Sequence, residues 1–487
     1  MTMYRWVSIG SESDYDQILS LVDSEFDPQK VVPRLKEAIS TAVRGMLIEY
    51  NYVDKDYRST YYNFYSKKGR SYRNDCIRLH FFAETVSFDE IQLDLTSGDG
   101  RLEDHYFGYM VLRPTMVATI GRSILSPNIR KDARGFVIQS QHRVHLLGYR
   151  LHLWGFPSMD QHTDIAVCAH VACWSILRHY SERYPQHREL LVHDITMMAH
   201  QFDPGGLVPS NGLEINQAER VFQQAGTYPL IVTKTPKTSE RFYRQLIAYL
   251  ESGFPLFVAM HNRGHAVAAI GHSRSSVPIT TTSTSSTHAW NQLEAVVVVD
   301  DNHLPYRVVP NSGAAAGGYS ASDFDSFIVP LPEKVFYPAE AVDRQSVTLG
   351  NLLSKFMPMP IGGDMVIRYF VTTLAALRQY MRVNQSQLGQ VLVNSVMQLQ
   401  AAQFVWVVEY ASLDQWTKGV ISARAVLDAT ASPYDPYPTW FAHGYDDAIF
   451  FDRSKADGQA LVVPLGRPDA VPIGRMEQNL RPVVARA

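Results

Sequence analysis

A cysteine, a histidine and an acidic pair follow one another along the chain in an order that suits thiol chemistry. Cys168 lies in TDIAVCAHVACWSILRHY, His265 lies in PLFVAMHNRGHAVAAIG, and Asp300 and Asp301 end EAVVVVDD. A nucleophilic cysteine requires a base that takes its proton, and the base requires a group that orients it. These segments therefore contain the residue types of a Cys-His-Asp triad.

Helical periodicity separates Cys168 from Cys173, which lies in the same segment. If a helix begins near Cys168, one apolar face is formed by Ala169, Ala172, Cys173, Ile176, Leu177 and Tyr180. Cys173 belongs to that face, which is typical of a small buried hydrophobic residue. Cys168 lies outside it at the helix start, where free N–H groups and the helix dipole favour a thiolate.

The segment around His265 predicts a β-hairpin. SERFYRQLIAYLESG has apolar residues at helical spacing and stops at Gly253. PLFVAMH and HAVAAIG follow as two strands that NRG connects, so His265 opens the second strand. A short strand next to a tight turn is a rigid support for an imidazole.

The acidic pair follows a run of four valines, which predicts a buried strand. An acid at a strand end is often only a turn former. Here, however, the acid ends the strand that follows a histidine opening a strand and a cysteine at a helix start. This order favours a functional role for the acid. Either Asp300 or Asp301 can then orient His265.

These segments together resemble the papain-like cysteine peptidases, and most closely the C39-like peptidase family. The resemblance covers residues 150 to 330. It rests on Gln161, a short loop and Cys168 in QHTDIAVCAHVACWSILRHY, on GLEINQAERVFQQAG, on SGFPLFVAMHNRGHAVAAIGH, and on the aspartate after an apolar strand.

The resemblance implies a role for each candidate residue. Cys168 would be the nucleophile, His265 the general base, and Asp300 the group that orients His265, with Asp301 as the second candidate. Gln161 would donate a side-chain N–H to the oxyanion, together with the backbone N–H of Cys168. The reaction would be attack on a peptide or protein amide, a thioester intermediate and hydrolysis.

Departures from the family pattern, among them the residue after the cysteine, and two alternatives accompany this interpretation. Ala169 follows Cys168 where the family usually has glycine, beside the expected oxyanion pocket. The same site could instead run deamidation or acyl transfer, because only the group that attacks the thioester differs. A catalytically inactive papain fold that serves as a binding module is the other alternative.

Other chemistry finds no support in the sequence. There is no HExxH or CxxC motif, so we expect no metal site, and no Walker loop or GxGxxG motif, so we expect no nucleotide cofactor. A formal net charge of −3 does not favour nucleic acid as a partner. The three cysteines form no disulfide framework, and the sequence contains neither an apolar span nor a signal peptide. We therefore expect a cytoplasmic protein without membrane insertion.

The 487 residues predict several α+β domains. We expect an N-terminal α+β domain over 1–150, a papain-like domain over 151–335, in which the Cys168 helix packs on an antiparallel sheet, and a C-terminal α+β domain over 336–487. The last residues, RMEQNLRPVVARA, predict a loose tail. The flanking domains would select the substrate or hold a protein partner.

Overall fold

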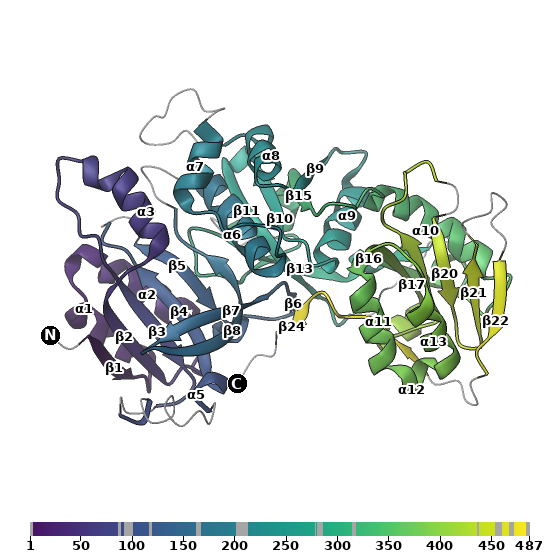
Figure 1. Cartoon of the computed structure of the whole chain (residues 1–487), viewed down its shortest axis with the longest axis horizontal. Coiled ribbons are helices and arrows are strands. Elements are labelled where there is room, and N and C mark those ends of the chain that lie inside the picture. Colours follow the sequence, from purple (N-terminus) through teal and green to yellow (C-terminus); the bar gives the residue numbers. More distant parts are fainter. Residues whose placement is uncertain are drawn as a thin grey trace.

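Three β-sheets follow one another along the long axis of the molecule in the computed structural model (Figure 1). The structure describes residues 3–85, 89–91, 101–115, 119–161, 167–200, 213–277, 279, 286–313, 318–435, 438–452, 460–466 and 472–483. Helices and mainly antiparallel sheets alternate through these residues, which confirms the α+β class.

The first sheet has seven strands, all antiparallel to their neighbours. In spatial order they are β1 (Tyr4–Ser8), β2 (Gly45–Tyr52), β3 (Cys76–Phe82), β4 (Tyr106–Leu112), β5 (Ile120–Leu125), β8 (Tyr149–Ser158) and β7 (Ser140–Leu146). Its principal helices are α2 (Pro28–Ala38) and α3 (Lys55–Asn63), with the single turns α1 (Ile18–Leu21) and α5 (Arg101–Asp104). In β7, buried and exposed residues alternate strictly, so one face of that strand packs on protein and the other does not.

The second sheet carries the candidate triad segments. Its main path is β14 (Arg307–Pro310), β13 (Leu293–Val299), β11 (His265–Arg274), β10 (Leu256–Met260), β15 (Ser326–Leu331) and β9 (Tyr228–Thr233), all antiparallel. The short strands β6 (Phe136–Val137) and β24 (Arg481–Pro482) are attached beside β11. At that crossing a Cβ on Gly271 would lie 2.2 Å from the carbonyl oxygen of Phe136, so only glycine allows the approach.

The helices of this central region are α6 (Cys168–Arg183), α7 (Val192–His200), α8 (Ile215–Gln224) and α9 (Ser239–Glu251). Helix α6 contacts β10 and β11 on one side and β7 and β8 of the first sheet on the other. Helix α9 similarly contacts β11 and the third sheet. Each of these two helices therefore joins neighbouring sheets, and one continuous core extends through all three.

The position of α6 between two sheets explains why its burial exceeds the prediction. The predicted apolar face is buried, but so are Trp174, Arg178 and His179 on the rest of the helix. Two of the polar side chains there have partners: the Trp174 Nε1–H donates to Asp56 Oδ1 at 3.2 Å, and His179 Nδ1 lies 3.1 Å from the Ser140 hydroxyl. Neighbouring residues from α3 and β7 thus make a polar helix face compatible with burial.

The third sheet contains β12 (Thr287–His288), β16 (Met365–Thr373), β17 (Phe404–Ser412), β19 (Ala423–Asp428), β20 (Thr439–His443), β21 (Asp447–Phe451) and β22 (Ala460–Pro464). The β12–β16 pair is parallel and the other pairs are antiparallel. Its helices are α10 (Ala339–Leu353), α11 (Leu374–Val383), α12 (Gln385–Leu388), α13 (Gln390–Gln398) and α14 (Leu413–Thr417), and β18 (Val420–Ile421) pairs with β23 (Ile473–Gly474).

The described residues place two segments differently from the sequence expectation. Strand β8 belongs to the first sheet, so that sheet continues past residue 150 to Ser158. The C-terminal segment is not loose over 475–483: Met476 and Leu480 are buried, and β24 pairs with β6. Tertiary contacts outweigh the weak local preferences of this segment.

Buried ion pairs hold the second and third sheets and the C-terminal segment together. Arg368 of β16 pairs with Glu251 at the end of α9, with Glu409 of β17 at 2.8 Å, and with Glu477 at 3.2 Å. The side chain of Arg368 is 3 % exposed, and those of Glu251 and Glu409 are 1 % and 0 % exposed. Each buried charge therefore depends on its partners for compensation.

Candidate active site

Cys168 is the first residue of α6, as the sequence predicts. Val167 at the N-cap position is extended and has no side-chain acceptor, so the first N–H groups of the helix are not capped by it. The Cys168 side chain is partly exposed and lines a cavity, whereas Cys173 is fully buried, which raises the pKa of its thiol. Of the two cysteines in this helix, only Cys168 is accessible to a substrate.

His265 opens β11 at the turn of the β10–β11 hairpin. It pairs with Met260 across the hairpin, and Gly264 before it has a φ of 57°, the left-handed conformation that glycine adopts readily. The His265 side chain is 17 % exposed and lines the same cavity as Cys168. The hairpin therefore holds the imidazole at the cavity wall.

Asp300 is the acid that contacts His265. The His265 Nε2 and the Asp300 Oδ1 are 3.2 Å apart. Asp300 follows β13, which is the neighbour of β11, so the pairing of these two strands brings the residues together. Because Nε2 faces Asp300, Nδ1 is the ring nitrogen left for the thiol.

The Asp300 carboxylate is stabilised by a dense set of donors. The Tyr319 hydroxyl donates to Oδ2 at 2.7 Å, Arg307 Nη1 donates at 2.9 Å, and the backbone N–H of Asn302 donates to Oδ1 at 3.0 Å. The Asn302 bond shows that Asp300 also forms the turn. Burial opposes ionisation, but His265 and these hydrogen bonds hold the Asp300 pKa well below its usual range.

The environment of His265 favours its protonated form. Burial lowers the pKa of the imidazole, but hydrogen bonds to Asp300 and Cys168, together with their negative charges, outweigh that effect and raise the pKa to about 10. Cys168 and His265 line one cavity and interact electrostatically, which connects the thiol to the His265–Asp300 pair. A thiolate beside an imidazolium is the reactive form of such a pair.

Asp301 lies close to these residues but is bonded differently from Asp300. It is 5 % exposed, and neither carboxylate oxygen has a hydrogen-bond partner within the described part of the chain. Burial raises its pKa to about 7, although the charge of His265 opposes the shift. Of the two acids that the sequence leaves open, Asp300 is the one that orients His265, and Asp301 faces the cavity.

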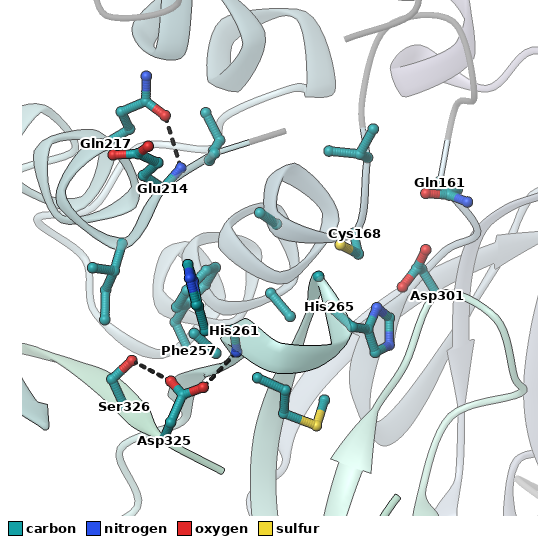
Figure 2. Close-up of a pocket in the computed structure, with 18 of the residues that line it drawn as sticks. Gln161, Cys168, Glu214, Gln217, Phe257, His261, His265, Asp301, Asp325 and Ser326 are labelled. Atoms are coloured by element: carbon teal, nitrogen blue, oxygen red, sulfur yellow. Dashed lines mark hydrogen bonds between the residues drawn. The ribbon is translucent and has the colours of Figure 1, made fainter. Parts of the chain in front are cut away.

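Gln161 lines the cavity of about 890 Å³ that also contains Cys168, His265 and Asp301. Figure 2 shows these four side chains gathered on one side of the cavity, with Glu214 on the other. Gln161 is therefore brought to the triad as expected. Residues 162–166, which connect it to α6, lie outside the described residues.

Ala169 also lines this cavity, directly after Cys168, and is 3 % exposed. Its methyl group therefore lies at the cavity wall next to the nucleophile candidate, where the resembling family usually has glycine. The first-turn N–H groups remain the donors that this end of the helix offers to an oxyanion.

The donor types of His265, Asp300 and Asp301 would also suit a metal ion, since one ligand atom of each lies within 4.8 Å of the others. Asp300, however, already accepts from four donors, one of which is the guanidinium of Arg307. A cation there would compete with Arg307, so we assign no metal to this cluster.

Two residues of the site, Tyr319 and Arg307, are not predicted by any sequence pattern. Tyr319 donates to Asp300, and its ring lies edge-on to His265 with centroids 6.0 Å apart. Arg307 bonds Asp300 and lies over the Tyr319 ring, 4.7 Å from its centroid. Neither residue belongs to a periodic pattern or motif, so only the fold reveals their roles.

Comparison of the chain with protein-family models, with curated proteins and with solved structures finds no match. The functional argument therefore depends on the geometry of the site. In the described residues, no helix is both long and apolar enough to cross a membrane.

Proposed function

We propose that this protein is a papain-like, C39-like cysteine peptidase in which Cys168 attacks a peptide or protein amide. The observation that carries the proposal is that Cys168 and His265 interact at the wall of one cavity, while His265 is hydrogen-bonded to Asp300. A cysteine at a helix start, beside an oriented imidazole and open to a cavity, has what a thiol nucleophile requires.

The proposed reaction has two steps. The Cys168 thiolate attacks the amide carbonyl carbon, and Gln161 and the first-turn N–H groups of α6 stabilise the oxyanion. The C–N bond then breaks, and His265 gives its proton to the leaving nitrogen, which produces a thioester. In the second step His265 takes a proton from water, the resulting hydroxide attacks the thioester, and the thiolate departs with a carboxylic acid as product.

Asp300 is a positioning residue in this scheme. It fixes the imidazole orientation through Nε2 and stabilises the imidazolium that the first step consumes and the second restores. Tyr319 and Arg307 in turn hold the Asp300 carboxylate. Removing either would disturb the His265 orientation without touching the substrate.

Alkylation of the thiols with iodoacetamide tests the proposal. At pH 6 an ordinary thiol is almost entirely protonated, so we expect Cys168 to react at least about tenfold faster than glutathione. Cys173 serves as the internal control, because it is fully buried and should stay unmodified. His265→Ala should remove the enhancement, since it removes the imidazolium.

A digest of a peptide mixture, analysed by mass spectrometry, then identifies the product. We expect new carboxyl termini with the wild type and none with Cys168→Ala. A glutamate formed from glutamine would instead identify a deamidase, and an amide formed with an added amine would identify an acyl transferase. If Cys168 reacts no faster than glutathione and His265→Ala changes nothing, the enzyme proposal fails.

A further inference from the structure

We propose that Asp301 binds a positively charged group on the leaving fragment of the substrate, so that the cavity takes peptides with an ammonium or guanidinium group just after the scissile bond. This inference rests on the proposed function, because it uses Cys168 as the nucleophile and His265 as the acid. It deepens that function by naming a substrate class.

The first argument is that Asp301 is a buried acid without a partner. Both carboxylate oxygens lack hydrogen-bond donors among the described residues, although the residue is only 5 % exposed. A buried carboxylate in this state is costly to the fold unless something supplies the missing donors. Because Asp301 lines the cavity, a ligand in the cavity can supply them.

The second argument is that the cations of this region pair with carboxylates other than Asp301. Arg34 pairs with Asp160 at 2.6 Å, and Arg307 pairs with Asp300 at 2.9 Å. His265 is bonded to Asp300 rather than to Asp301. The charged groups with the largest effects on the Asp301 pKa are His265, which lowers it, and Asp300 and Asp160, which raise it. Two of them are acids, which makes a cation the complementary ligand.

The third argument is the charge of the cavity as a whole. Among the described residues that line it are three carboxylates, from Glu214, Asp301 and Asp325, one imidazolium, from His265, and no lysine or arginine. Asp325 already accepts from the backbone N–H of His261 and from the Ser326 hydroxyl. An acidic cavity attracts cationic substrates, and Asp301 is its deepest unpaired acid.

The position of Asp301 relative to His265 indicates on which side of the scissile bond the cationic group of the substrate lies. His265 must reach the leaving nitrogen, so the leaving fragment lies on the His265 side of Cys168. An oxygen of Asp301 lies within 4.8 Å of a His265 ring nitrogen, and Figure 2 shows both side chains on the same side of Cys168. A lysine or arginine at the start of the leaving fragment can therefore reach Asp301.

Thiol-specific reagents of different charge test the inference without a known substrate. Methanethiosulfonates that carry an aminoethyl, hydroxyethyl or sulfonatoethyl group react with a thiolate. The thiolate forms a disulfide with the sulfur that bears this group, and methanesulfinate is released. The rate ratio of the cationic to the neutral reagent at Cys168, divided by the same ratio for 2-mercaptoethanol, cancels the thiolate fraction. A chelator keeps metal ions away from the carboxylates.

With the wild type at pH 8 we expect this normalised ratio to be about ten, as an attraction of about 1.4 kcal/mol gives. It should fall to about one to two in Asp301→Asn. Asp414→Asn, which removes an exposed acid paired with Lys418, is the matched control and should keep the wild-type ratio. The ratio should also decline below pH 7, because Asp301 then gains a proton.

Cleavage-site profiling supplies the second readout. In a digest of a peptide library, we expect lysine and arginine to be enriched about tenfold within two residues after the cleaved bond, and Asp301→Asn to lose this enrichment. Equal reagent ratios in Asp301→Asn and the wild type would overturn the inference, as would enrichment only before the cleaved bond. An unreactive Cys168 would overturn the proposed function as well, whereas reactivity without charge preference overturns this inference alone.

Discussion

Substituting asparagine for two adjacent aspartates should change stability in opposite directions. Asp301→Asn replaces a buried carboxylate that lacks partners, and Asp300→Asn removes one that accepts four hydrogen bonds. The side chains are neighbours of the same size, so volume and helix or strand preference do not distinguish the two variants. Only the surroundings of each carboxylate do.

The magnitude for Asp301 follows from its pKa. A carboxyl with a pKa of about 3.9 in the unfolded chain and about 7 in the folded protein binds its proton more tightly when folded. Its contribution to stability is therefore complete below pH 4 and is lost as the pH rises through 7. Linkage gives a loss of about 4 kcal/mol between pH 4 and pH 8.

Asparagine at position 301 does not titrate, so this loss disappears from the variant. At pH 8 we expect the free energy of unfolding of Asp301→Asn to exceed that of the wild type by about 2–4 kcal/mol. This is less than the full linkage value, because an ionised Asp301 can draw solvent into the open cavity. At pH 4 the wild type and the variant should differ by less than about 1 kcal/mol. For a cooperative unit of 150–250 residues, the gain at pH 8 corresponds to a Tm increase of about 5 to 10 °C.

The sign is reversed for Asp300. Its folded-state pKa lies well below the usual range, so it contributes stability at neutral pH that is lost as the pH falls through that low value. Asp300→Asn leaves Arg307 and the His265 imidazolium without their anion, and we expect a loss of about 3–5 kcal/mol at pH 7. The deficit should shrink in acid.

Thermal and urea unfolding of the wild type and both variants, from about pH 2 to pH 8, measures these differences, since the Asp300 effect changes only below about pH 4. The informative quantity is the stability of each variant relative to the wild type as a function of pH. The reasoning is wrong if Asp301→Asn is less stable than the wild type at pH 8, or if its advantage does not grow between pH 4 and pH 8. A variant that gains stability and loses its preference for cationic reagents would identify Asp301 as a site kept for binding at the expense of the fold.

Three further outcomes are expected. The kcat/KM of peptide cleavage should fall above pH 10, because His265 then loses the proton that the leaving nitrogen needs. The alkylation rate of Cys168 should not fall there. If both rates showed the same pH dependence, this expectation would be contradicted. Tyr319→Phe removes a donor to Asp300 and should cost about 1–2 kcal/mol in urea unfolding at pH 7, and an unchanged midpoint would show that the bond contributes nothing. Arg368→Met removes a cation shared by the buried Glu251 and Glu409, which retain Arg274 and Arg424 as partners, and should cost about 3–5 kcal/mol, with part of the loss recovered when one of these glutamates is replaced by glutamine.

Several parts of the site follow from local sequence patterns. The start of α6 at Cys168, the β10–β11 hairpin whose second strand begins at His265, and the strand before Asp300 are all present as predicted. Each depends on contacts within a few residues: helical spacing of apolar residues, a tight turn with Gly264, and a run of valines. Such patterns identify elements because the periodicities of helices and strands differ.

Other features depend on which elements become neighbours. The burial of the polar face of α6 requires helix α3, which supplies Asp56, and strand β7 of the first sheet, which supplies Ser140, as hydrogen-bond partners. The C-terminal segment is held in a defined conformation because β24 pairs with β6. No local pattern in either segment indicates these partners.

The sequence by itself determined the candidate residues Cys168 and His265 and an acid at the end of β13, because each lies at the boundary of a strongly patterned element. Only the tertiary structure decided between Asp300 and Asp301. Adjacent residues after a strand point in different directions, so one meets His265, Arg307 and Tyr319 while the other faces the cavity without a partner. Which side chains receive donors is a property of the packed sheet, and the sequence near the two acids contains no signal of it.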